Sequence, residues 1–185
     1  RLGPDFEPEP WLCKSYTYDP VSYTYVFTLY HGITFSDGSF LTSADVKATL
    51  DRARSSERYG ARLSDVTGIT AGSETVTVTL ASPNTGFPAL LDIPIVKDGT
   101  WERPVGTGPY LFSAEDSGDW LIANQSWWRG AKQPLDRIAL VEASDQDTLL
   151  YRFSSHDVQL MTADLTGTTP ISATDNVTYL DAGTT

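Results

Sequence analysis

Cysteine and histidine are almost absent from this sequence: its 185 residues include one cysteine and two histidines. Because a structural zinc site usually takes four Cys or His ligands, the chain lacks the residues to build one. A single cysteine also excludes a disulfide-based scaffold. The chain is long enough to bury a hydrophobic core without such cross-links, so we expect a globular protein with no metal and no cofactor. Cys13, between Leu12 and Lys14, is predicted to be a buried apolar thiol.

Basic residues are also few, with 13 Lys and Arg against 24 Asp and Glu, which gives a formal net charge of -11. Most of the excess acid lies after residue 62. This charge would repel a polyphosphate chain, so nucleic acid is not expected as a partner. Anionic membrane surfaces are disfavoured for the same reason.

Long apolar runs are missing too. No stretch approaches the ~20 residues of a membrane span, and no secretory hydrophobic region is present. The first residue is Arg1 rather than methionine. We therefore expect that the chain was processed or cut from a longer protein.

Alternating hydrophobic residues predict several strands, bounded by turns that contain Gly, Asp, Ser or Pro. In 75–80, for example, two valines and a leucine face one side while three threonines face the other. Strands are expected over 24–30, 66–71, 75–80, 110–114, 120–124, 137–142, 158–161 and 177–180. The pattern as a whole is α+β, with strands outnumbering helices.

Two helices are predicted from capping boxes, in which the N-cap side chain accepts from the N3 amide and the N3 carboxylate reaches back. Thr42 and Asp45 predict a helix over 43–54. Ser144 and Asp147 predict a second helix that ends near residue 153. We expect this second helix to bury its apolar side chains, which are Leu149, Leu150 and Phe153.

Catalytic motifs are weak in this sequence. A Ser–His–Asp triad needs a histidine within hydrogen-bond reach of a nucleophile, and the Gly-x-Ser-x-Gly pattern of a nucleophile elbow is absent. His31 and His156 are therefore interpreted as surface residues, and no catalytic residue is assigned. Any two of the 24 acids could meet in space as a hydrolase pair, and the sequence leaves this alternative open.

Two further features are candidates for binding. Segment 106–109, Gly-Thr-Gly-Pro, is glycine-rich, but Pro109 lacks an N–H and a strand follows, so a tight structural turn is favoured over a phosphate cradle. Four of the five tryptophans are the other candidate, because they either cover core edges or stack on sugar rings. They are Trp101, Trp120, Trp127 and Trp128. The second use defines an alternative function, a carbohydrate-binding β module with exposed Trp101, Trp127 or Trp128.

Several blocks of the sequence occur in an order and spacing that resemble one protein family. The first is 25–53, YVFTLYHGITFSDGSFLTSADVKATLDRA, and the second is 104–110, PVGTGPY. Asn124, Trp128 and the segment 135–138, LDRI, follow where the family has similar residues. Over about 10–160 the chain resembles the family-5 extracytoplasmic solute-binding proteins, which are the peptide- and nickel-binding components of ABC importers. It departs from the family pattern at Ser36, Phe40, His156 and Gln159.

The resemblance implies a mixed β-sheet lobe of a type II (class C) periplasmic-binding-protein-like fold, present as an incomplete N-terminal lobe. It implies that 1–103 form a variable subdomain of that lobe, with strands and one capped helix. Residues 104–185 would then be part of the main sheet subdomain that leads to the hinge. The matching motifs specify fold rather than ligand chemistry, so the ligand-binding residues remain unassigned.

The resemblance also implies a function without catalysis. A solute-binding subunit captures a peptide or similar small solute by closure of two lobes and delivers it to an ABC permease in the membrane. The implied location is extracytoplasmic, either periplasmic or tethered to the outer face of the cytoplasmic membrane. Self-association is a further expectation, through apolar surface that missing segments of the lobe would otherwise cover.

Overall fold

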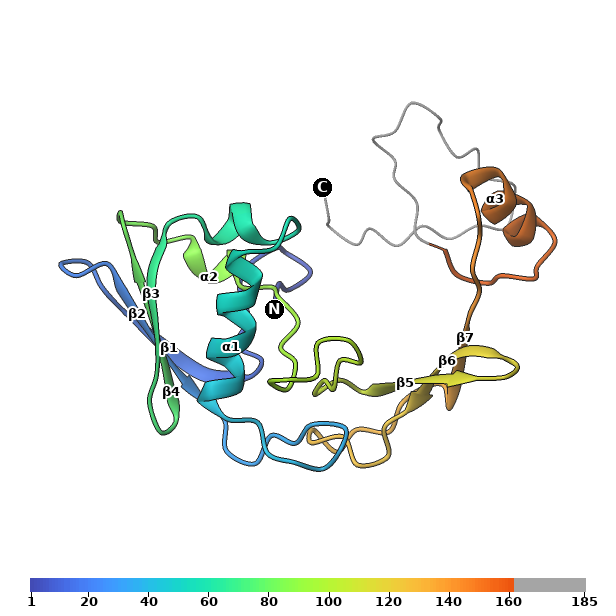
Figure 1. Ribbon diagram of the computed structural model, residues 1–185, viewed down its shortest axis with the longest axis horizontal. Coiled ribbons are helices and arrows are strands. Elements are labelled where there is room, and N and C mark those ends of the chain that lie inside the picture. The colour runs from blue at the N-terminus through green and yellow to red at the C-terminus, as the bar shows by residue number, and fades with distance from the viewer. Residues whose placement is uncertain (162–185) are drawn as a thin grey trace. The chain divides into compact units, whose positions relative to one another are not determined.

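The computed structural model describes residues 1–161 of the chain (Figure 1). Its contacts divide the chain into two units. Unit 1 comprises Arg1–Leu111 and Ile122–Asp136, and unit 2 comprises Phe112–Leu121 and the chain from Arg137 onward. The strand predicted over 177–180 lies outside the described residues. Within the described part, no helix is long and apolar enough to cross a membrane.

Unit 1 is built on a four-stranded antiparallel sheet with the strand order β1-β2-β4-β3. The predicted alternation in 75–80 is confirmed, because Val76, Val78 and Leu80 are buried and the three threonines are only partly buried. Tyr25 pairs with Val78 on the same buried face. A shift of one residue would expose this whole face, so burial sets the register. The strands are β1 (Cys13–Asp19), β2 (Thr24–Leu29), β3 (Val66–Ala71) and β4 (Thr75–Leu80).

Helix α1 (Ser43–Arg54) has the bounds that the sequence predicts. The Thr42 hydroxyl accepts from the Asp45 N–H, and the Asp45 carboxylate accepts from the Thr42 N–H at 2.9 Å, so the capping box is complete. The helix packs against β3 and β4, as Figure 1 shows. Its buried apolar side chains are Val46, Leu50 and Ala53.

Two short helical turns close the core of unit 1, η1 (Gly60–Leu63) and α2 (Phe87–Leu90). Phe87 is 1% exposed, and its ring centroid lies 5.5 Å from that of Tyr25. The Tyr25 hydroxyl donates to the Asn84 carbonyl at 2.8 Å, which satisfies the polar end of a buried side chain.

Cys13 lies at the start of β1, a strand that the sequence did not predict. Its side chain is only half-buried, although it packs against the core of unit 1. The predicted burial is therefore confirmed only in part. Burial still raises the pKa of the Cys13 thiol, because an apolar environment disfavours the thiolate.

The second sheet has three strands in the order β5-β6-β7: β5 (Tyr110–Glu115), β6 (Gly118–Ala123) and β7 (Arg137–Leu140). Only two residues join β5 to β6, so these strands form an antiparallel hairpin. All three predicted strands are confirmed, with ends that differ from the predicted ones by at most two residues. The described chain is thus a mixture of helix and sheet, as the sequence predicts.

Helix α3 (Gln146–Ser154) of unit 2 forms where it is predicted but begins with a different cap. The N-cap is Asp145, not Ser144, and its carboxylate accepts from the Thr148 N–H at 2.7 Å. Ser144 instead donates its hydroxyl to the Asp145 carboxylate at 2.9 Å. An ionised carboxylate at the N-cap also interacts favourably with the helix dipole, which explains the shift by one residue.

Two other expectations for this region are wrong. Helix α3 has no buried residue, and Leu149, Leu150 and Phe153 are only half-buried. The segment 158–161 is not a strand, because the chain turns back at the end of α3, where the Val158 N–H donates to the Arg152 carbonyl at 3.1 Å.

Candidate functional site

The segment 104–110 is a junction at which loops of unit 1 meet. The Gly106 carbonyl accepts from the Ser36 N–H at 2.9 Å, and the Val105 carbonyl accepts from the Lys97 N–H at 2.8 Å. The two sequence blocks that carry most of the family resemblance, 25–53 and 104–110, are therefore in direct contact.

Three side chains from the loop after β6 hold the same junction. Asn124, which is 7% exposed, donates from its carboxamide to the Gly108 carbonyl at 3.3 Å. The indole N–H groups of Trp127 and Trp128 both donate to the Thr107 carbonyl, at 3.0 and 3.2 Å. These bonds tie the carbonyls of the glycine-rich segment to the loop after β6, which favours its interpretation as a structural turn.

Asp37 links the predicted turn at 36–38 to the rest of the junction. Its carboxylate accepts from the Lys97 ammonium at 2.6 Å and from the N–H and hydroxyl of Ser39 at 3.0 and 2.6 Å. The bond from Lys97, followed by those from Ser39, holds the pKa of Asp37 well below its usual range. Gly38 has a φ of 84°, a conformation that glycine adopts without strain.

Trp11 is the centre of an aromatic and cationic cluster in unit 1. The guanidinium carbons of Arg1 and Arg129 lie 3.9 and 4.0 Å from the centroid of its ring. Arg129 also lies 5.3 Å from the ring centroid of Trp128, and Trp127 packs against Trp11 with centroids 6.4 Å apart. Sequence reasoning missed this cluster, because Trp11 and Arg129 come together only through the fold.

The tryptophans considered as a sugar platform are all half-buried. The guanidinium of Arg52 lies 4.9 Å from the ring centroid of Trp101, and that of Arg137 lies 4.2 Å from that of Trp120. Together with the indole bonds to Thr107, these contacts indicate structural use of the tryptophans.

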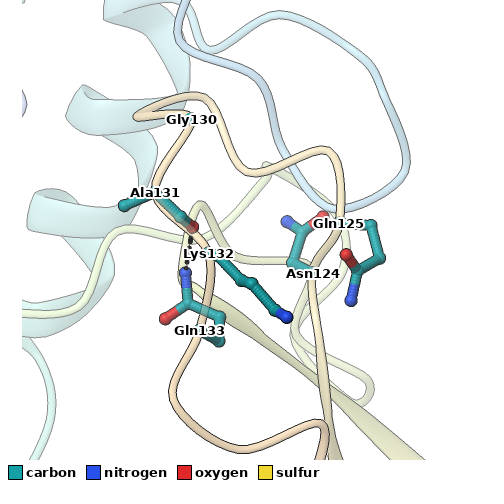
Figure 2. A pocket seen from close by; sticks show the side chains of 6 residues that line it. All are labelled: Asn124, Gln125, Gly130, Ala131, Lys132 and Gln133. Carbon is teal, nitrogen blue, oxygen red and sulfur yellow. Dashed lines mark hydrogen bonds between the residues drawn. The ribbon is translucent and has the colours of Figure 1, made fainter.

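A hollow of about 260 Å³ lies in the loop that follows Asn124 in unit 1. Figure 2 shows the Lys132 side chain crossing the hollow toward Asn124 and Gln125, while Gln133 donates from its carboxamide to the Ala131 carbonyl at 2.8 Å. Its lining residues are Asn124, Gln125, Gly130, Ala131, Lys132 and Gln133. The sequence offered no motif for this hollow.

The two histidines have surroundings that differ from those of a catalytic base. His31 Nε2 lies 3.1 Å from a Glu74 carboxylate oxygen, and both side chains are more than half exposed. His156 is exposed and has a φ of 63°. Within residues 1–161, neither imidazole is hydrogen-bonded to a hydroxyl or thiol.

Metal ligands and acid catalysts receive no support from the described residues. No group of three or more His, Cys, Asp or Glu side chains in that part of the chain could hold a metal ion. The carboxyls with a shifted pKa there all have it lowered, whereas a general acid needs it raised. These carboxyls are Asp19, Asp37, Asp45 and Asp145.

The fold defines the class of this protein. The structure is similar to solved solute-binding proteins that have the type II periplasmic-binding-protein fold. One is the protein AgaA of A. tumefaciens R10, solved in complex with agropinic acid. The TM-score is 0.68 at 28% identity, and the match covers 85% of this chain and 35% of that one. NikA from Staphylococcus aureus, solved with Ni(L-His)2, also has a TM-score of 0.68 at 24% identity and shows the fold alone.

The sequence gives the family. The model of the bacterial extracellular solute-binding proteins, family 5 middle, matches residues 7–184. The chain belongs to this family, and both the predicted resemblance and the predicted fold class are confirmed. A carbohydrate-binding module is not supported.

Among curated proteins, the chain is similar to the glutathione-binding protein GsiB. It is 28% identical over 164 residues to GsiB of Salmonella typhimurium and 29% identical over 154 residues to that of Escherichia coli K12. The first match covers 80% of this chain and 32% of the relative. The chain thus spans about a third of the length of the curated relatives that it matches.

Proposed function

We propose that this chain is part of the solute-binding subunit of an ABC importer. The whole subunit would capture a peptide or similar small solute and deliver it to a permease in the membrane. The family match over residues 7–184 carries this proposal. The glutathione-binding relatives support a peptide-like solute, because glutathione is itself a small peptide.

In this proposal the subunit acts by binding alone and releases its solute unchanged. Closure of two lobes around the solute shifts the population toward a closed state, which the permease recognises. The subunit would work outside the cytoplasm, in the periplasm or tethered to the outer face of the cytoplasmic membrane. Membership of a family of extracellular solute-binding proteins supports that location.

We also propose that residues 1–103 form a variable subdomain and that 104–185 belong to a main sheet subdomain that leads to a hinge. The order of elements supports this division. The first sheet and helix α1 lie before residue 104, and β5, β6 and β7 lie after it.

Unit 2 supports a further proposal, self-association of the 185-residue chain. Large apolar side chains are exposed on this unit, including Phe112 at 62% and Tyr151 at 73%. Exposed apolar surface of this kind is typical of sites that pair with another chain. We expect the sedimentation coefficient to rise with concentration, and less steeply in Tyr151→Glu. Gln146→Glu in α3, which adds the same charge at an exposed polar residue without removing apolar surface, is the matched control.

Native mass spectrometry of the complete natural protein that contains this chain tests the main proposal. We expect a mass increase from a co-purified small solute, which disappears after unfolding and refolding in buffer. Calorimetric titration with glutathione and with other short peptides then identifies the class. Turnover of a solute, without a stable complex with any of them, would refute the proposal.

A further inference from the structure

The hollow after Asn124 differs from the rest of the molecule in its charge. The chain contains 24 acids and has a net charge of -11, yet none of the six residues that line the hollow is acidic. The only charged side chain among them is Lys132. This hollow is therefore one place where an otherwise anion-repelling chain presents positive charge.

Lys132 has no partner of its own within residues 1–161. Lys47 pairs with Asp51, and Lys97 lies 2.6 Å from the Asp37 carboxylate. Within residues 1–161, Lys132 makes no ion pair or hydrogen bond. Its side chain extends across the hollow (Figure 2). A lysine ammonium can donate three hydrogen bonds, so its donors are available to a ligand.

Further donors belong to the residues that line the same hollow. The backbone N–H groups of Ala131, Lys132 and Gln133 and the Gln125 carboxamide donate to no acceptor in the described part of the chain, so water or a ligand is their partner. The lining therefore offers uncharged donors beside the Lys132 ammonium and contains no carboxylate. Anions are bound in proteins by such groups of backbone N–H donors next to a cation.

Hydrogen bonds order the loop that carries these donors. The Gly130 N–H donates to the Trp127 carbonyl at 2.8 Å, and the Trp127 indole is bound to Thr107. On the far side, the bond from the Gln133 carboxamide to the Ala131 carbonyl closes a turn. Because these bonds order the backbone of the loop before a ligand arrives, less of its conformational entropy is lost on binding.

We propose that this hollow binds a small oxyanion, either a carboxylate or an inorganic phosphate, with the Lys132 ammonium as its counter-ion. Carboxylate and phosphate share the chemistry that the hollow offers, since each presents at least two acceptor oxygens on one centre. A volume of about 260 Å³ has room for such a group with its bound waters. The site is a property of unit 1, and the proposal does not depend on the transport function.

The test is a titration of the ¹⁵N-labelled chain with sodium phosphate and, separately, with sodium acetate, at constant ionic strength. We expect saturating shifts of the backbone amide signals of Gly130, Ala131, Lys132 and Gln133. Saturation by phosphate alone would identify a phosphate site, and saturation by acetate as well would identify a general carboxylate site. Failure of both anions to saturate these signals would overturn the proposal.

Variants separate the lysine from its surroundings. Lys132→Gln should weaken binding about tenfold, the effect expected from loss of a charged hydrogen bond, while Lys132→Arg should retain most of it. Lys14→Gln, a change of an exposed lysine in β1, is the matched control and should bind as the unchanged chain does. Equal affinity of Lys132→Gln and the unchanged chain would contradict the assigned role.

Discussion

Unit 1 and unit 2 each contain a helix that begins with a complete N-cap, but only one of these helices packs into a core. Helix α1 buries Val46, Leu50 and Ala53 against β3 and β4. Helix α3 buries no residue at all. Local capping and periodicity specify where a helix forms, whereas a buried position also needs a surface to pack against.

The polar contacts of the two units differ in the same way. Unit 1 joins distant segments through buried or half-buried groups, such as the contacts of Asn124 and Trp127 with the segment 104–110. In unit 2 the ion pair of Arg137 and Glu115, at 2.9 Å, joins exposed side chains. We therefore expect unit 1 to dominate the measured stability of the chain.

The largest expected effect comes from removing a core side chain. Leu50→Ala in α1, where Leu50 is 4% exposed, should lower the free energy of unfolding by about 3 kcal/mol, because it leaves a cavity. Leu150→Ala in α3 should cost less than about 1 kcal/mol, because that side chain is only half-buried. Urea denaturation followed by circular dichroism measures both. Similar losses for the two variants would contradict the difference between the units.

Polar side chains provide the next comparison. Asn124→Ala should cost about 2 kcal/mol, because it leaves the Gly108 carbonyl and the Ser126 N–H without their partner in a buried region. Glu115→Gln in unit 2 should cost less than about 1 kcal/mol, as for other exposed ion pairs. Gln125→Ala, at the exposed neighbour of Asn124, is the control. If Gln125→Ala lowered the free energy of unfolding as much as Asn124→Ala, the hydrogen bonds of Asn124 at the junction would not explain the loss.

The two helix caps should respond in different ways. Thr42→Ala should cost about 1 kcal/mol in global unfolding, because α1 is part of the core. Asp145→Ala should instead raise hydrogen exchange of the amides in α3 and leave the urea midpoint nearly unchanged. Thr85→Ala, in an exposed loop, controls for the loss of a threonine side chain. A large shift of the midpoint in Asp145→Ala would show that α3 is coupled to the core.

The smallest effect concerns pH. The folded state holds the pKa of Asp37 below its ordinary value of 3.8, chiefly through Lys97. A lowered pKa contributes stability that is present above about pH 4 and is lost as the pH falls toward the folded value. Urea midpoints measured between about pH 2 and pH 6 should therefore fall less steeply in Asp37→Asn than in the unchanged chain. The Asp145 pKa is lowered by the Thr148 N–H, but Asp145→Asn should leave this global slope unchanged.

Much of unit 1 could be predicted from its sequence. The alternation in 75–80 and the capping box of Thr42 and Asp45 are local signals, and the elements that they predict have the expected bounds. Strand β1 was missed because four of its seven residues in a row, 14–17, are exposed, so an edge strand lacks the usual alternation. Its half-buried Cys13 follows from that edge position.

The candidate site could be predicted less well. The motif residues at 104–110 and at Asn124 are visible in the sequence, but their mutual hydrogen bonds are not. Arg129 and Lys132 carried no signal at all, since an isolated basic residue in a loop is common. The surroundings of Arg129 come from Trp11, which is far away in the sequence. Those of Lys132 come from the turn that its neighbour Gln133 closes.

The sequence by itself determined the family and the bounds of α1, β3 and β4, because these depend on motifs of residues close together in the chain. The tertiary structure alone decided which helix is buried and which tryptophans donate to the segment 104–110. These outcomes depend on contacts between residues far apart in sequence, and such contacts exist only once the sheet has placed its loops side by side.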